Sequence, residues 1–102
     1  MGDVEAESDL GNTEYKLMLK FPKADRIQRL TTQMKFRMQE GTGEAFYLIG
    51  VKDDGEAFGI NTEQMELSLR TLHRMAWTLK FNLAIRSITK GKNGEIAKVM
   101  VF

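Results

Sequence analysis

The chain has no cysteine, and it has only one proline and one histidine among its 102 residues. Without cysteine it cannot form a disulfide or a thiolate metal site, and a single histidine argues against a histidine-based one. No apolar run approaches the roughly 20 residues that a helix needs to span a bilayer. The acidic N-terminus also lacks the apolar stretch of a secretory signal. The composition therefore predicts a cytoplasmic protein without a membrane partner.

The sequence also lacks the G-x-x-x-x-G-K-[ST] phosphate loop of many nucleotide-binding proteins. Gly50, Gly55 and Gly59 lie in and around a predicted hairpin, so they do not form a dinucleotide-binding loop between a strand and a helix. The lone histidine has no evident nucleophile or metal partner in the sequence. We therefore expect this chain to be no enzyme and to hold no catalytic residue, cofactor or metal.

Acidic and basic residues are unevenly distributed along a chain whose net charge is only +1. Residues 1–10 carry four acidic residues and no cation, whereas residues 20–39 carry six cations and one acidic residue. A nearly neutral chain with one basic segment favours a local contact with an anionic partner. It is not typical of a protein that coats nucleic acid.

Residues 1–12 are predicted to be a disordered acidic tail, and residues 13–102 a single domain. Alternating apolar residues from Tyr15 to Phe21 predict a strand. Apolar residues at helical spacing predict one helix over 23–39 and a second that runs to about residue 80. The second helix begins at Asn61, with Gln64 as its capping-box partner. Further strands are predicted at 44–52, 57–60, 83–88 and 96–102.

These elements have the order β-α-β-β-α-β-β. The simplest packing is an α+β two-layer sandwich, in which both helices cover one face of a mostly antiparallel five-strand sheet. The first six elements follow the ferredoxin-like order. The sequence therefore predicts a ferredoxin-like variant with one additional terminal strand.

Two predicted helical surfaces combine cations with an aromatic ring. Such a combination suits stacking on an unpaired base with phosphate contacts, and it equally suits a protein interface. For His73 a structural role at the sheet edge is the favoured interpretation. Phe36 could equally lie under a loop. The candidate RNA- or partner-binding residues are Arg26, Arg29, Lys35, Phe36, Arg37, Arg70, His73, Arg74 and Trp77.

Several short motifs carry a resemblance to a known family. The best matched are Thr32-Gln33-Met34-Lys35, Gln39-Glu40-Gly41, Ile49-Gly50-Val51 and Thr71 to Ala76. Over about residues 12–101 the chain resembles the small domain that precedes the GTPase domain in the elongation-factor-like GTP-binding proteins one and two. The family has tryptophan where this chain has Phe36, so an aromatic ring is kept there.

The resemblance implies a non-catalytic N-terminal accessory domain of a translation GTPase. Such a domain is expected to dock to RNA or the ribosome, or to the adjoining GTPase domain, and no DNA partner is expected. GTP and Mg²⁺ would belong to the parent protein, because no GTPase motif lies in this chain. A protein-interaction or dimerisation module is the first alternative.

A second alternative is a ribonuclease. Glu40, Glu44, Asp53 and Asp54 stand near two glycine-containing turns, and paired carboxylates can bind a divalent metal or act in hydrolysis. The segment from Glu44 to Gly55 distantly resembles the AlbA-like domain of Schlafen-type proteins. Turn acids also form hydrogen bonds with their own backbone, which is the simpler interpretation.

Overall fold

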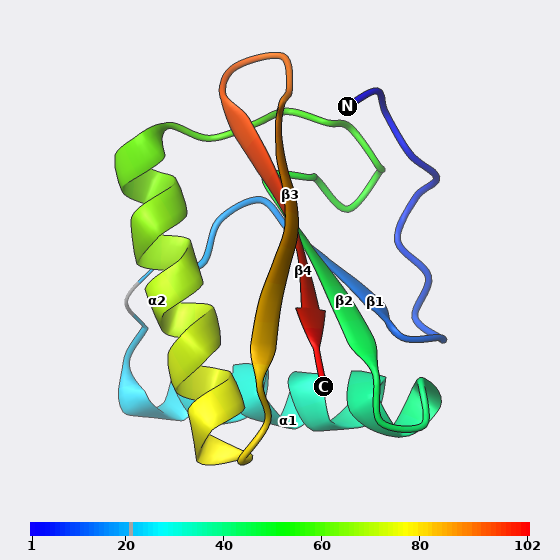
Figure 1. The fold of residues 1–102 in the computed structure, drawn as a ribbon, viewed down its shortest axis with the longest axis vertical. Coiled ribbons are helices and arrows are strands. Elements are labelled where there is room, and N and C mark those ends of the chain that lie inside the picture. The colour runs from blue at the N-terminus through cyan, green and yellow to red at the C-terminus, as the bar shows by residue number, and fades with distance from the viewer. Residues whose placement is uncertain (21) are drawn as a thin grey trace.

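The computed structural model describes residues 1–20 and 22–102, and this part of the chain folds into two helices and four strands (Figure 1). Both predicted helices form, and so does the capping box before the second one. There the Asn61 side chain accepts a hydrogen bond from the Gln64 amide at 2.7 Å, and the Gln64 side chain accepts one from the Asn61 amide at 3.1 Å. The elements are β1 (Thr13–Lys16), α1 (Ala24–Glu40), β2 (Ala45–Ile49), α2 (Thr62–Thr78), β3 (Leu83–Lys90) and β4 (Glu95–Val101).

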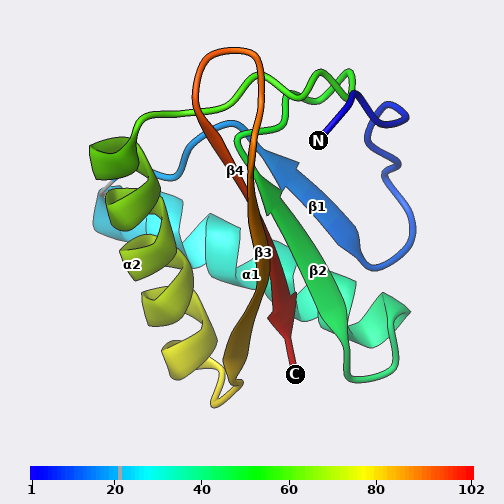
Figure 2. The ribbon, with the colours of Figure 1, turned by 45° about the horizontal axis from the view of Figure 1, so that its top comes forward.

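The four strands form one mixed sheet in the order β1-β2-β4-β3. β1 runs parallel to β2, and α1 makes the crossover between them. β4 is antiparallel to both β2 and β3, and a tight connection joins β3 to β4 (Figure 2). The prediction of an α+β two-layer protein with a largely antiparallel sheet is confirmed.

The prediction of five strands and of a ferredoxin-like order is wrong. The predicted strand at 57–60 contributes only two isolated bridges, Val51 with Ala57 and Ile60 with Glu95. This segment instead binds the β3–β4 connection, where the Asn93 amide donates to the Phe58 carbonyl at 2.6 Å. Gly55 and Gly59 both have positive φ angles near 90°, so the chain cannot continue as an extended hairpin arm. The observed order is therefore β-α-β-α-β-β.

The first strand is shorter than predicted. It ends at Lys16, and the Leu19 amide donates to the Ser68 hydroxyl of α2 at 2.9 Å. Leu19 thus binds α2 rather than extending the sheet. Phe21, the last residue of the predicted strand, lies outside the described residues.

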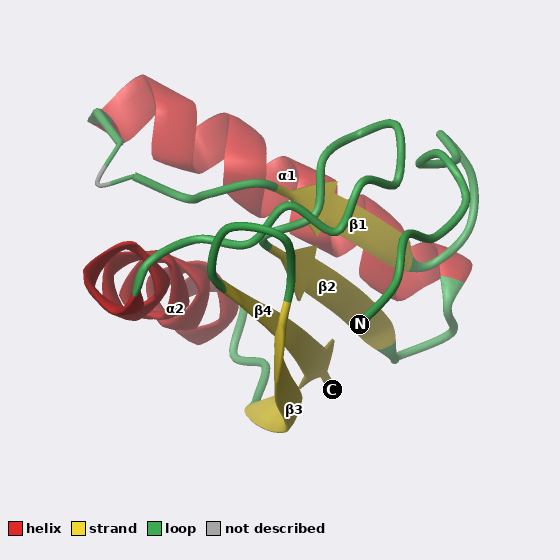
Figure 3. Ribbon diagram, turned by 90° about the horizontal axis from the view of Figure 1, so that it is seen from above, coloured by secondary structure: helices red, strands yellow, loops and turns green. Residues whose placement is uncertain are grey.

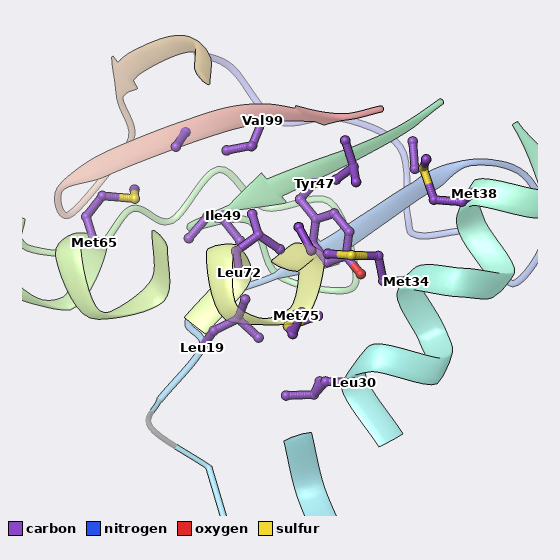
Figure 4. Close-up of a cluster of buried hydrophobic side chains, with 14 of the residues drawn as sticks. Leu19, Leu30, Met34, Met38, Tyr47, Ile49, Met65, Leu72, Met75 and Val99 are labelled. Atoms are coloured by element: carbon purple, nitrogen blue, oxygen red, sulfur yellow. The ribbon is translucent and has the colours of Figure 1, made fainter. Parts of the chain in front are cut away.

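Both helices pack on the same face of the sheet, as predicted (Figure 3). The core between the layers contains Tyr47 and Ile49 of β2 and Val99 of β4, packed against Met34 of α1 and Leu72 of α2 (Figure 4). These side chains are fully buried. The helices do not run side by side, because α1 lies across the view of Figure 1 while α2 stands nearly upright in it.

Residues 1–12, expected to be a disordered tail, contain no helix or strand, but they make hydrogen bonds and apolar contacts with the folded part of the chain. The Val4 amide donates to the Gly55 carbonyl at 2.8 Å, and the Glu7 amide donates to the Asp53 carbonyl at 2.7 Å. Val4 also packs on a second, smaller apolar cluster that includes Leu48. In the structure the first residues of this segment therefore pack on one end of the sheet face opposite the helices, at the turn that contains Asp53 and Gly55.

Candidate docking surface

Arg37, predicted to belong to the binding surface, is instead buried with only 3% of its surface exposed. Its Nε donates to the Glu14 carboxylate of β1 at 2.6 Å. Its two Nη groups donate to the carbonyls of Ser8, Leu10 and Gly11 at 2.8–3.0 Å. The guanidinium therefore joins α1, β1 and the N-terminal segment, and it is not available to an RNA phosphate. The outward role predicted for Arg37 is wrong, because its guanidinium group pairs with the buried carboxylate of Glu14.

Two carboxyl groups of the N-terminal segment have pKa values displaced in opposite directions. A hydrogen bond from the Ala57 amide and another from Lys92 lower the pKa of Asp3. Burial raises the pKa of Glu7, although its carboxylate accepts a hydrogen bond from the Tyr15 amide. Acid therefore weakens the attachment at Asp3 but relieves the cost of burying charged Glu7. The two effects oppose each other, so the segment is not a simple acid-operated switch.

Phe36 is partly exposed, at 39% of its surface, but its surroundings are acidic. It lines a surface hollow that also contains four carboxylates and two cations, the latter being Lys16 and the buried Arg37. Nearby on the same helix, Arg29 forms an exposed ion pair with Asp25 at 3.5 Å. Phosphate groups would be repelled from such a hollow. The acidic residues that line it are Glu7, Asp9, Glu14 and Asp53.

The basic residues of α1 separate into two places. Arg26 lines a hollow that also contains Met18, Lys20 and Pro22, away from Phe36. Lys35 lines another hollow, which it shares with Phe81 of the turn after α2. Because α1 crosses α2 steeply, the two predicted basic faces do not merge into one surface. Of the α1 candidates, only Lys35 shares a hollow with the residues that follow α2.

The α2 candidates do lie together on an exposed surface. Arg70, His73, Arg74 and Trp77 are all exposed, and Trp77 has 75% of its surface accessible. The His73 and Trp77 rings stack, with centroids 6.4 Å apart and planes inclined by 26°. The His73 ring therefore lies beside the indole ring on this surface. The binding role of these residues stays a prediction, but the structure presents them to solvent together.

The C-terminal end of α2 carries residues that the sequence pattern did not single out. The Phe81 amide donates to the Ala76 carbonyl at 2.8 Å, and the Lys80 amide donates to the Trp77 carbonyl at 3.0 Å. These bonds form a Schellman motif, whose left-handed position usually holds glycine. Here Lys80 occupies it, with φ at +61°. A lysine in this conformation carries a strain of about 1 kcal/mol.

We expect Lys80→Gly to raise the free energy of unfolding by about 1 kcal/mol, because glycine adopts a positive φ without steric strain. Urea denaturation of the chain measures this change. Lys80→Ala is the matched control, since it removes the ammonium group but keeps the strained Cβ. Equal stability of the two variants would show that the backbone at Lys80 is not strained.

The α2 candidates lie in a part of the sequence that is rich in cations. Residues 67–102 carry seven Lys or Arg and one acidic residue, Glu95, for a net charge of +6. Residues 1–66 carry the balance of −5. This asymmetry is not apparent in short windows of the sequence, because residues 20–39 have a higher density of cations than residues 67–102. The cations of the C-terminal region are Arg70, Arg74, Lys80, Arg86, Lys90, Lys92 and Lys98.

The carboxylates of the ribonuclease alternative do not form a metal-binding group. Glu40 accepts a hydrogen bond from the Gly11 amide, and Asp54 accepts one from the Glu56 amide. Among residues 1–20 and 22–102, no three Asp, Glu, His or Cys side chains are placed to hold a metal ion. The structure gives this alternative no support.

The sequence contains no G-x-x-x-x-G-K-[ST] phosphate loop. Neither of the two described helices is long and apolar enough to cross a bilayer.

Known proteins resemble this chain over part of their length. No protein-family model and no solved structure matches it. GTP-binding protein 2 of Mus musculus and of Homo sapiens is 56% identical over 70 residues, which are 69% of this chain and 12% of the relative. GTP-binding protein 1 of Xenopus laevis is 32% identical over 95 residues, which are 93% of this chain and 14% of the relative. The chain therefore belongs to the family of GTP-binding proteins 1 and 2, and it spans about an eighth of the length of these relatives.

Proposed function

We propose that this chain is a non-catalytic accessory domain, at the N-terminal side of a GTP-binding protein, that docks to RNA through the C-terminal half of α2. The observation that carries the proposal is the 75% exposure of Trp77 on a surface that also presents Arg70, Arg74 and Lys80. Proteins bind RNA by pairing cations with phosphates and by stacking bases on aromatic rings. The C-terminal half of α2 offers both kinds of group.

Charge supports this choice of surface. Residues 67–102 carry a net charge of +6, whereas the hollow beside Phe36 on α1 is lined by four carboxylates and two cations. Phosphate contacts are electrostatic, so they favour the first region. The resemblance to translation GTPases favours ribosomal RNA or tRNA, and a cytoplasmic place of action. GTP and Mg²⁺ would then bind elsewhere in the full-length protein.

Salt dependence of RNA affinity tests the proposal. The probe is a fluorescein-labelled RNA of about 12 unpaired nucleotides, within the range of single-strand site sizes. If Arg70, Arg74 and Lys80 each neutralise one phosphate, log K should fall with log salt at a slope of about −2. Fluorescence anisotropy between about 50 and 200 mM salt measures this slope.

Charge reversal on α2 locates the surface. We expect Arg70→Glu combined with Arg74→Glu to weaken RNA binding about 100-fold at low salt, because two contacts to charged groups are lost. Arg26→Glu combined with Arg29→Glu makes the same charge change on α1 and should leave binding nearly unchanged. The absence of RNA binding at low salt would contradict the proposal.

Docking to the adjoining GTPase domain is the second candidate, and one observation favours it. Ile85 and Ile88 of the edge strand β3 are exposed at 54% and 49% of their surfaces. Exposed apolar side chains on an edge strand can pack against a second protein. In that case Ile85→Ser and Ile88→Ser would weaken the contact with the GTPase domain with little dependence on salt.

A further inference from the structure

The turn between α2 and β3 forms a hollow next to Trp77. Its volume is about 570 Å³, within the range of roughly 300–1,000 Å³ that is typical of small-ligand sites. Two aromatic rings belong to its wall, those of exposed Trp77 and half-buried Phe81. The remaining lining comes from Thr78, Lys80 and Asn82. The hollow thus combines flat apolar walls with a cation and a side-chain amide.

The backbone around this hollow is held in place. The Asn82 amide donates to the Phe102 carbonyl at 2.7 Å, and the Phe102 amide donates back to the Asn82 carbonyl at 3.0 Å. On the other side, the Schellman hydrogen bonds keep Lys80 in its left-handed conformation. The His73 ring stacks with the indole of Trp77. A site whose walls are already ordered loses little conformational entropy when a ligand binds.

The chemistry of the lining matches a nucleobase with its phosphate. The indole ring offers a flat surface for stacking, and stacking on aromatic rings tolerates every base. The Asn82 side chain has both a donor and an acceptor, which are the groups needed to pair with the polar edge of a base. Within the described residues the side-chain amide of Asn82 makes no hydrogen bond, and Asn82 is exposed. Lys80 supplies a cation for the phosphate of the same nucleotide.

We propose that the hollow formed by Trp77, Lys80, Phe81 and Asn82 binds one unstacked nucleobase, so that the domain prefers single-stranded or looped RNA to duplex RNA. The inference rests on the proposed RNA docking and adds the class of RNA that is recognised. Bases inside a duplex are already stacked and paired, so they cannot enter the hollow without disruption of the helix. A duplex could still contact the cations of α2.

Trp77 is the only tryptophan of the chain, so its fluorescence reports directly on the hollow. A single-stranded RNA of about 12 nucleotides should quench this fluorescence and bind at least about tenfold more tightly than a duplex of equal length. The duplex should leave the indole fluorescence nearly unchanged. Anisotropy of the labelled RNA, measured in the same titration, gives the affinity independently.

Substitutions separate the base site from the phosphate contacts. Trp77→Ala should weaken single-strand binding by about 5- to 150-fold, as the loss of one stacked base does, and should leave duplex binding unchanged. Trp77→Phe keeps a ring and should recover most of the affinity. Phe36→Ala is the matched control, because it removes another exposed aromatic residue from acidic surroundings. Circular dichroism confirms that each variant folds.

The remaining outcomes distinguish failure of the base site from failure of the proposed docking. Salt-dependent RNA binding with unchanged Trp77 fluorescence, or an equal loss for single strand and duplex in Trp77→Ala, would overturn the base site and leave the proposed docking intact. A failure of all RNAs to bind at low salt would overturn the proposed docking, and the base site with it. Weakening by Phe36→Ala as large as that by Trp77→Ala would place the stacking surface on α1 instead.

Discussion

Replacing Arg37 with methionine is expected to lower the free energy of unfolding by about 3–5 kcal/mol, because it leaves a buried charge without its partner. Glu14 is only 6% exposed, and its main partner is the Arg37 Nε at 2.6 Å. Lys16, at 3.5 Å, would be the remaining cation near this carboxylate. The carbonyls of Ser8, Leu10 and Gly11 would also lose their shared donor. Urea denaturation measures the loss.

The double variant Arg37→Met with Glu14→Gln is the control for this prediction. It removes both charges, so it should recover a large part of the stability that the single variant loses. Exposure of the N-terminal segment to limited proteolysis should rise in Arg37→Met, since Arg37 binds three of its carbonyls. A loss below about 1 kcal/mol in the single variant would contradict the structural role assigned to Arg37.

Replacing Gly59 with alanine is expected to lower the free energy of unfolding by about 3 kcal/mol, for two separate reasons. Its φ angle is +90°, a conformation that costs a non-glycine residue about 1–2 kcal/mol. A Cβ at this position would lie 2.5 Å from the Gly94 carbonyl oxygen, which belongs to rigid backbone. Such overpacking adds about 1–3 kcal/mol. Thermal unfolding followed by circular dichroism measures the combined loss.

Gly43→Ala separates the two contributions. Gly43 has a similar φ of +98°, but nothing lies within 4 Å of the position that its Cβ would take. It should therefore lose only about 1–2 kcal/mol, which is the conformational part. Equal losses in the two variants would show that segment 57–60 moves away from the β3–β4 connection at little cost.

The helices were predictable because their signals are local. Apolar residues recur at helical spacing along α1 and α2, and the Asn61–Gln64 capping box lies within one turn. The central position of β2 was also predictable, since Phe46 to Ile49 offers apolar side chains to both faces. In contrast, the sequence could not tell that residues 57–60 leave the sheet. That outcome depends on the contact between Gly59 and Gly94, which are distant in the chain.

The residue types of the candidate site were predictable from the sequence, but the surface on which they are exposed was not. The pairing of aromatic rings with cations is visible on both helices, but exposure depends on what covers each residue. Phe36 lies beside the acidic N-terminal segment, and Arg37 is buried under it. Trp77 has no such cover, and Lys80, Phe81 and Asn82 join it only because the chain turns sharply after α2.

By itself the sequence determined the two helices, the apolar strand β2 between them, the family and the lack of a nucleotide-binding loop. These follow from the identities of neighbouring residues, so they need no knowledge of long-range contacts. Only the tertiary structure decided which of two similar helical surfaces faces solvent. It paired Arg37 with Glu14, because a buried cation needs a counter-charge, and the N-terminal segment that binds Arg37 also places acidic side chains around Phe36.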